Sequence, residues 1–187
     1  EGSSQEWDDL LEKYNMSRSA AVTFKGNPLT LAGDEIQVGQ KAPDFTLHYY
    51  QDGLKTITLA DLAGKPTLVS VVPSLDTPVC QLQTKKFNEE LASLGEQINS
   101  VTVSLDLPFA MNRFCAAEEV KSMRTGSDYQ DRSFGRNWGM LIEELKLLAR
   151  GVFVLDADGK VTHAETVSEV TEEPNYDAAL GALKSLL

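Results

Sequence analysis

The chain has 187 residues, of which 42% are hydrophobic, a length that suits one well-packed domain and is short for two. Its formal net charge of −11 argues against nucleic acid as a partner, because neutralising phosphates takes clustered lysine and arginine. With two cysteines and two histidines we expect neither a disulfide framework nor a metal or other cofactor, although two thiols suffice for one redox couple.

Residues 1–20 are expected to form an acidic extension outside a single domain over residues 21–187. Their large apolar side chains follow the spacing of one helical face, at Trp7, Leu10, Leu11 and Tyr14. A short amphipathic helix that docks on the domain or on a second subunit is one interpretation. A tether with a marginal helix is favoured over it, because an isolated helix of this length is barely stable in water.

No apolar run reaches the roughly 18 residues that a membrane span requires, so we expect no membrane partner. The sequence begins with Glu1, and a leader ahead of it would not be visible. The cytoplasm is the expected compartment, with the periplasm or export as open alternatives.

The first part of the domain has the alternating pattern of β-strands. Apolar side chains alternate over residues 22–31 on either side of a turn at residues 26–28, which predicts a β-hairpin across one end of the domain. Short strands are expected over residues 41–47 and 54–59.

The first cysteine lies where a buried strand meets a helix. Residues 68–72 are mostly β-branched and apolar, as in a central strand, and Pro73 ends the strand by withholding a hydrogen-bond donor. Thr77 and Pro78 are favoured at the start of a helix, so Cys80 is expected in the first helical turn. Free N–H groups there favour an anion, and the thiolate is the reactive form of cysteine.

A buried structural cysteine is the competing interpretation of Cys80, since cysteine often acts as a small hydrophobe. Its position at the carboxyl end of a parallel strand favours the reactive interpretation, because ligands bind at that edge of α/β sheets.

A helix is expected over residues 78–94, with Leu82 and Phe87 on its inward face and Gly95 at its end. Residues 98–105 form the next strand, parallel to the first because a whole helix separates the two. This βαβ unit favours an α/β thioredoxin-like fold, in which helices flank a central mixed sheet.

The second cysteine, Cys115, follows that strand, with apolar bulk around it from Phe109, Met111 and Phe114. Residues 116–123 are expected to be helical. The spacing of the two cysteines excludes a Cys-x-x-Cys motif, so a partner thiol would come from the helix after the second strand.

Residues 124–136 are expected to be a polar surface connection, with the aromatic side chains of Tyr129, Phe134 and Trp138 turned inward. Residues 139–148 have the leucine spacing of a helix.

The last part of the chain predicts a strand over residues 152–155, a turn at residues 158–159, a partner strand over residues 161–165 and a helix that runs to Leu187. If the strand over 152–155 runs antiparallel to that over 68–72, Arg150 lies where the parallel strands end and faces Cys80. A solvated surface charge is the alternative, but Arg150 stands between an apolar stretch and a core strand.

Separated motifs resemble those of the thiol peroxidase branch of the peroxiredoxins, which belong to the thioredoxin-like superfamily. They are Pro73-x-x-x-Thr77-x-x-Cys80, residues 104–110 followed by Arg113-Phe114-Cys115, and Leu148-Ala149-Arg150. Residues 39–45 also resemble a peroxiredoxin segment in which an aromatic at the place of Phe45 packs near the reactive thiol, with plain core packing as the alternative.

The resemblance implies a thioredoxin-dependent peroxidase, an atypical two-cysteine peroxiredoxin. Hydroperoxide would oxidise the peroxidatic Cys80 to a sulfenic acid, the resolving Cys115 of the same subunit would form a disulfide with it, and thioredoxin would reduce that disulfide. It implies a homodimer without a cofactor. The implied site residues are the catalytic Cys80, Cys115, Thr77 and Arg150 and the substrate-binding Pro73 and Phe45.

Two further interpretations belong to other classes. One is a thioredoxin-like interaction domain with idle cysteines, since a fold does not fix a function. The other is an oxidoreductase acting on protein disulfides, which is disfavoured because Thr77 stands where a second sulfur is required. Apolar residues near both thiols suggest that organic hydroperoxides are tolerated as well as hydrogen peroxide.

Overall fold

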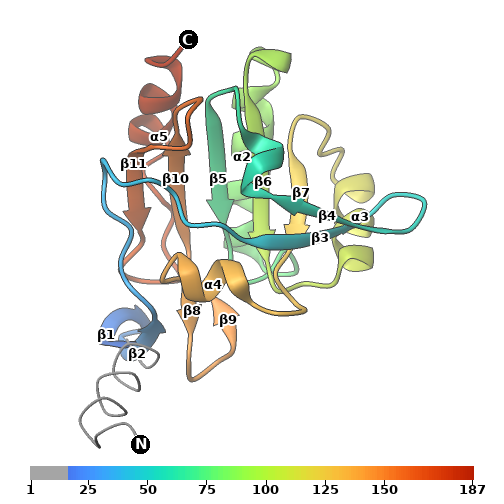
Figure 1. Cartoon of the computed structure of the whole chain (residues 1–187). Coiled ribbons are helices and arrows are strands. Elements are labelled where there is room, and N and C mark those ends of the chain that lie inside the picture. Colours follow the sequence, from blue (N-terminus) through green and yellow to red (C-terminus); the bar gives the residue numbers. More distant parts are fainter. Residues whose placement is uncertain (1–16) are drawn as a thin grey trace, which may run out of the picture.

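A seven-stranded mixed sheet lies at the centre of the structure, a computed structural model that describes residues 17–187 (Figure 1). The strand order is β11-β10-β5-β6-β7-β3-β4. The strands are β3 (Thr46–Tyr50), β4 (Leu54–Thr58), β5 (Thr67–Val71), β6 (Asn99–Ser104), β7 (Arg124–Ser127), β10 (Gly151–Leu155) and β11 (Val161–Thr166). The helix considered around Trp7 to Tyr14 lies outside the described residues.

The directions of the strands follow the predicted βαβ topology. β5, β6 and β7 are parallel, as a helix between consecutive strands requires. β10 runs antiparallel to β5, and the pairing of Gly151 with Val71 places the beginning of β10 at the carboxyl end of β5. The outer strands β11, β3 and β4 are also antiparallel to their neighbours.

Side chains of alternate residues along β5 enter two separate cores, since successive strand residues face opposite sides of a sheet. On one side, Leu68 and Val72 belong to a core with residues of α2 (Pro78–Leu91), α3 (Pro108–Ala117) and α5 (Tyr176–Lys184). On the other, Val69 and Val71 belong to a core with the N-terminal hairpin and α4 (Ser133–Asn137). The expected mixed sheet flanked by helices is therefore confirmed.

A second, four-stranded sheet has the order β1-β2-β8-β9 and lies at the lower end of Figure 1. It contains β1 (Ser17–Phe24), β2 (Asn27–Ala32), β8 (Leu141–Ile142) and β9 (Leu147–Leu148). The predicted N-terminal hairpin is confirmed, and its first strand already begins at Ser17. The short 3₁₀ helices are η1 (Leu59–Leu62) and η2 (Gly95–Gln97).

The helix predicted over residues 139–148 is wrong, because these residues form the β8–β9 hairpin. Ile142 pairs with Leu31 of β2, and the Glu143 N–H donates to the Thr30 carbonyl, so the edge of the N-terminal hairpin takes up this segment. Lys146 has a positive φ of 53°, which no α-helix contains. Pairing with a distant strand overrides the leucine spacing.

The helix predicted over residues 116–123 is also misplaced. α3 covers Pro108–Ala117 and therefore contains Cys115 itself. Pro108 is favoured in the first helical turn, and the positive φ of 55° at Glu119 is incompatible with a continuing helix.

The polar connection predicted over residues 124–136 contains the strand β7 and most of α4. Gly126 packs so closely that an added Cβ would lie 2.8 Å from Cδ1 of Leu47, which explains a glycine inside a strand. Phe134 and Trp138 are buried as predicted, and Tyr129 is half-buried.

Smaller differences concern where elements begin and end. α2 ends at Leu91 instead of residue 94, and Leu82 is 55% exposed instead of inward. The strand predicted over residues 41–47 starts only at Thr46. Among residues 17–187, none of the helices combines the length and the apolar character that crossing a membrane requires.

Candidate active site

Cys80 lies in the first turn of α2, at the carboxyl end of the parallel strands. Thr77 is the N-cap residue with an extended backbone (φ −130°, ψ 149°), and Pro78 begins the helix. The Cys80 side chain is fully buried, at 0% exposure. The local structure is the one that the Pro73–Cys80 motif predicts, and it leaves the sulfur near the positive end of the helix.

Arg150 reaches Cys80 from the other side of this edge, directly before β10. Its side chain is only 2% exposed, and Nη2 donates a hydrogen bond to Cys80 Sγ at 3.3 Å. The predicted placement of Arg150 opposite Cys80 is thus confirmed. It follows from the antiparallel register of β10 and β5, which sets the residue before Gly151 beside the end of β5.

The Arg150 guanidinium is fixed by three hydrogen bonds. Besides the bond to sulfur, Nε donates to the Val170 carbonyl at 2.9 Å and Nη1 donates to Gln83 Oε1 at 3.0 Å. None of the ion pairs among residues 17–187 includes Arg150. The guanidinium therefore lies directly against the Cys80 sulfur, and its other two hydrogen bonds are to the neutral groups of Gln83 and Val170.

Gln83 is a site residue that the sequence reasoning missed. It is buried at 0% exposure, one turn after Cys80, and its Nε2 donates to Ser70 Oγ at 2.9 Å while its Oε1 holds Arg150. A glutamine three residues after the cysteine on the inward face of a helix is the signal that points to it, because buried polar groups are normally hydrogen-bonded.

Thr77 and Pro73 lie in the loop between β5 and α2. Pro73 is buried, whereas Thr77 is exposed and its hydroxyl donates to the Ser74 carbonyl at 2.9 Å. The Thr77 hydroxyl therefore bonds to the loop that precedes Cys80.

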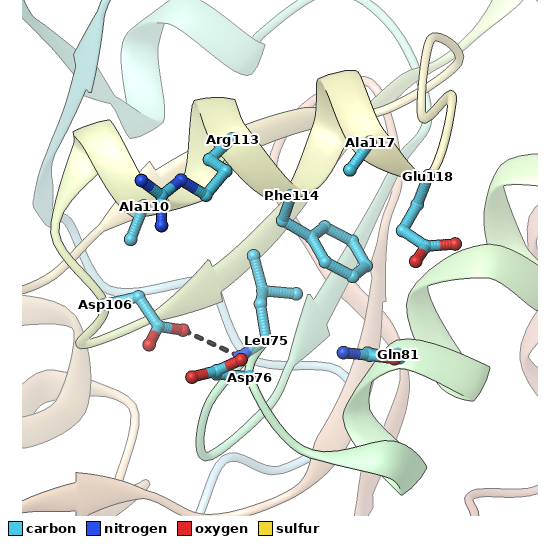
Figure 2. Close-up of a pocket in the computed structure, with 9 residues that line it drawn as sticks. All are labelled: Leu75, Asp76, Gln81, Asp106, Ala110, Arg113, Phe114, Ala117 and Glu118. Carbon is cyan, nitrogen blue, oxygen red and sulfur yellow. Dashed lines mark hydrogen bonds between the residues drawn. The ribbon is translucent and has the colours of Figure 1, made fainter.

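Asp106 ties the same loop to the end of β6. Its carboxylate accepts from the Ser74 hydroxyl at 2.8 Å and from the Leu75 N–H at 2.7 Å, the second of which is drawn in Figure 2. This loop and the start of α2 form one wall of a cavity of about 300 Å³, and α3 forms the opposite wall with Phe114 and Ala117 (Figure 2).

Cys115 lies on α3, is half-buried, and is a free thiol, as is Cys80. Burial raises the pKa of the Cys115 thiol. Its side chain packs against the same core as Cys80, but it also lines a separate cavity of about 340 Å³ with Tyr49 and Arg124. The structure thus places Cys115 near the core that holds Cys80 without a bond between the two.

Phe45 is not brought to Cys80. It belongs to the core on the opposite face of the sheet, where its ring packs 5.5 Å from that of Phe134 and 5.9 Å from that of Trp138. The physical reason is that the Phe45 ring is buried in the aromatic cluster of Phe134 and Trp138 at α4. Plain core packing, the alternative interpretation, describes its surroundings.

Within residues 17–187 no group of His, Cys, Asp and Glu side chains gathers in a way that would hold a metal ion. The chemistry available at the site is that of a buried sulfur beside a fixed guanidinium at a helix N-terminus.

Comparisons with known proteins match this arrangement. The sequence matches the Redoxin family over residues 37–180. Thiol peroxidase from Bacillus subtilis (strain 168) is 52% identical over 168 residues, which cover 90% of this chain and 99% of that protein. Thiol peroxidase from Staphylococcus aureus (strain MRSA252) is 54% identical over 165 residues, or 88% of this chain and 98% of that protein. A solved structure of a peroxiredoxin-like protein from Aquifex aeolicus has a TM-score of 0.83 at 40% identity, and the match covers 92% of this chain and 99% of that chain.

The fold and the cysteine–arginine pair define a thioredoxin-like redox protein, and the matches are decisive on its membership: the chain belongs to the Redoxin family. Its thiol peroxidase relatives, at 52 to 54% identity, place it among the peroxidase enzymes of that family. The predicted family and fold are confirmed, and so is the prediction of an enzyme over that of an interaction domain.

Proposed function

We propose that the Cys80 thiolate reduces the hydroperoxide. Its sulfur attacks the terminal oxygen, an S–O bond forms as the O–O bond breaks, and the sulfur is oxidised by two electrons to a sulfenic acid. The leaving oxygen takes a proton and departs as water or an alcohol. The observation that carries this proposal is the 3.3 Å contact between Cys80 Sγ and Nη2 of a buried Arg150.

Arg150 is proposed to act on both reactants. A guanidinium is always charged and presents several donors in a fixed fork, so it favours the thiolate and can donate to the peroxide oxygens as they gain charge. Gln83 and the Val170 carbonyl support this role, because they fix the orientation of the fork. Gln83 and Val170 are therefore positioning residues.

Thr77 and Pro73 are proposed to form the mouth of the site. The Thr77 hydroxyl would turn from the Ser74 carbonyl towards the incoming peroxide and stabilise its leaving oxygen, together with the Cys80 N–H. Pro73 would shield the sulfur from bulk water, in keeping with its burial.

Cys115 is proposed to resolve the sulfenic acid within the same subunit. Its sulfur attacks the Cys80 sulfur, a disulfide forms, and the hydroxyl group leaves as water. A disulfide needs Cα atoms about 4.4 to 6.8 Å apart, so we propose local unwinding around Cys80 and Cys115 during this step. The reversible disulfide is then open to reduction.

The reductant is proposed to be thioredoxin, which would reduce the disulfide between Cys80 and Cys115 while its own two thiols form a disulfide. The enzyme is proposed to act as a homodimer. Both proposals rest on the resemblance of the Cys80, Cys115 and Arg150 motifs to those of the thiol peroxidases. Hydrogen peroxide and organic hydroperoxides are the proposed substrates.

Stopped-flow reduction of hydrogen peroxide by the wild-type enzyme and its cysteine variants tests the function. Cys80→Ser should consume no peroxide, and Cys115→Ser should consume one equivalent and then stop. Steady turnover with thioredoxin should require both thiols. Peroxide consumption by Cys80→Ser at the wild-type rate would refute the proposal.

A further inference from the structure

Asp106 connects the segment that carries Cys80 with the segment that carries Cys115. It lies between the end of β6 at Ser104 and the start of α3 at Pro108. Oδ1 accepts from the Ser74 hydroxyl at 2.8 Å, and Oδ2 accepts from the Leu75 N–H at 2.7 Å. The Asp106 carboxylate therefore holds the loop that precedes the reactive cysteine through two hydrogen bonds. Hydrogen bonds to a charged acceptor are stronger than those between neutral groups.

Asp106 is itself hydrogen-bonded to the ends of two strands of the sheet. The Ser104 hydroxyl donates to Asp106 Oδ2 at 2.7 Å, and the Ser127 hydroxyl at the end of β7 donates to the Asp106 carbonyl. The Asp106 N–H donates to Ser104 Oγ at 3.1 Å. Asp106 thus has a fixed position relative to β6 and β7, and it transfers that position to the loop.

Ser74 passes the restraint on towards Cys80. Its hydroxyl bonds Asp106, while its carbonyl accepts from the Thr77 hydroxyl at 2.9 Å. Thr77 is the N-cap of the helix whose first turn contains Cys80. The path from Asp106 through Ser74 to Thr77 therefore sets the position of the helix start before the hydroperoxide arrives.

The two thiols have different surroundings in the structure. Cys80 is fully buried in its helical turn, whereas Cys115 opens onto the cavity shared with Tyr49 and Arg124. Between the loop and α3 lies the cavity of about 300 Å³ shown in Figure 2, which gives the two walls room to move. Movement of the loop from its present place requires the two bonds from Asp106 to be broken.

We propose that Asp106 is a positioning residue that holds the loop in the peroxide-reactive arrangement and restrains the step that forms the disulfide. The inference rests on the function proposed above. In the restrained step the Cys115 sulfur attacks the sulfenic sulfur of Cys80, the S–S bond forms, the S–O bond breaks, and the hydroxyl leaves with the thiol proton as water. Asp106 thus acts oppositely on the two steps.

Rapid-quench kinetics on Asp106→Ala separate the two steps. Peroxide consumption in a single turnover measures the first, and the loss of trappable sulfenic acid measures the second. The bonds from Ser74 and Leu75 to the Asp106 carboxylate are charge-assisted hydrogen bonds. We therefore expect their loss to slow the first step about tenfold and to accelerate the second about tenfold.

Asp76→Ala is the matched control. Asp76 lines the same cavity, and its carboxylate makes no hydrogen bond to any residue in the described part of the chain, so both of its rates should equal those of the wild type. Ser74→Ala removes one of the two bonds to the loop and should shift both rates in the same directions by a smaller factor. It carries the test if Asp106→Ala does not fold.

Equal slowing of both steps in Asp106→Ala and Ser74→Ala, or rates that match those of Asp76→Ala, would overturn the inference while leaving the peroxidase function intact. A Cys115→Ser enzyme, which cannot resolve the sulfenic acid, that reduces peroxide without any trappable sulfenic acid would instead overturn the proposed function and this inference with it.

Discussion

Arg150 Nη2 lies 3.3 Å from Cys80 Sγ, and both side chains are withdrawn from solvent. The contact joins two residues that are distant in the sequence, one at the start of α2 and the other just before β10. It exists because β10 runs antiparallel to β5, so the sheet topology itself sets the cation against the thiol.

Replacing Arg150 should separate the effect of its positive charge from the effect of the several N–H donors of its guanidinium. Arg150→Lys keeps a cation but cannot bond Cys80, Gln83 and the Val170 carbonyl together, and we expect peroxide reduction to slow about 10- to 100-fold, the equivalent of one or two lost charge-assisted bonds. Arg150→Met should be slower still. Stopped-flow kinetics measure both, with the exposed Arg136→Lys as control, and equal rates for Arg150→Lys and wild type would contradict the role.

Gln83→Leu should lower both stability and activity. Leucine leaves Arg150 Nη1 and Ser70 without their buried partner, at a cost of about 1 to 3 kcal/mol in the free energy of unfolding. Denaturant unfolding measures the loss, and peroxide kinetics at low denaturant measure the effect of a less oriented guanidinium. Gln81→Ala, two residues earlier and half-exposed, should change neither quantity.

Gly151→Ala should disturb the site through the backbone. An added Cβ at this position would lie 2.6 Å from the Glu165 carbonyl oxygen of β11, so the two strands beside Arg150 have to separate. Overpacking of this kind typically costs about 1 to 3 kcal/mol. Gly181→Ala is the control, because a Cβ there has no neighbour within 4 Å and alanine favours the helix. Thermal unfolding of the two variants should move in opposite directions.

The contribution of Asp128 to the free energy of unfolding should fall as the pH rises from about 4 to 6. Burial raises the pKa of Asp128 from 3.8 to about 6, although the N–H groups of Gly135 and Phe134 act in the opposite direction. In this window the folded protein binds more protons at Asp128 than the unfolded chain does, so stability decreases with increasing pH.

Asp128→Asn provides the comparison for that pH effect, because it cannot titrate. Burial lowers the pKa of His163, which acts with the opposite sign, but His163 is present in both proteins and cancels in their difference. Denaturant unfolding at several pH values should therefore show the wild type losing stability relative to Asp128→Asn between pH 4 and 6. A constant difference across this range would refute the assignment.

Local signals were sufficient for the centre of the site. The Pro73, Thr77 and Cys80 spacing determines a strand end and a helix start within a few residues, and Arg150 follows from one further assumption about strand direction. Gln83 was missed because a polar residue on a helix is normally exposed, and its spacing of three residues from Cys80 is a weaker signal than that expectation. The structure shows that it is buried against Arg150.

The incorrect elements depend on long-range pairing. Residues 141–148 have a spacing compatible with a helix or with strands, and contact with β2 decides for strands. Arg124 to Ser127 are polar, yet they form a strand because β6 and β3 supply partners on both sides. Phe45 belongs to a different core from Cys80, because its ring packs against Phe134 and Trp138. These partners come almost a hundred positions later in the chain, and no local pattern indicates them.

Locating the sulfenic acid is the most direct test of the central claim that the Cys80 sulfur, opposed by Arg150, attacks the peroxide. The Cys115→Ser variant is treated with one equivalent of hydrogen peroxide and a sulfenic-acid trapping reagent, and its peptides are analysed by mass spectrometry. The account predicts that the label is found on Cys80 and that the yield drops sharply when Arg150 is also replaced by methionine. Peroxide consumption without a label on Cys80, or an equal yield in the absence of Arg150, would contradict it.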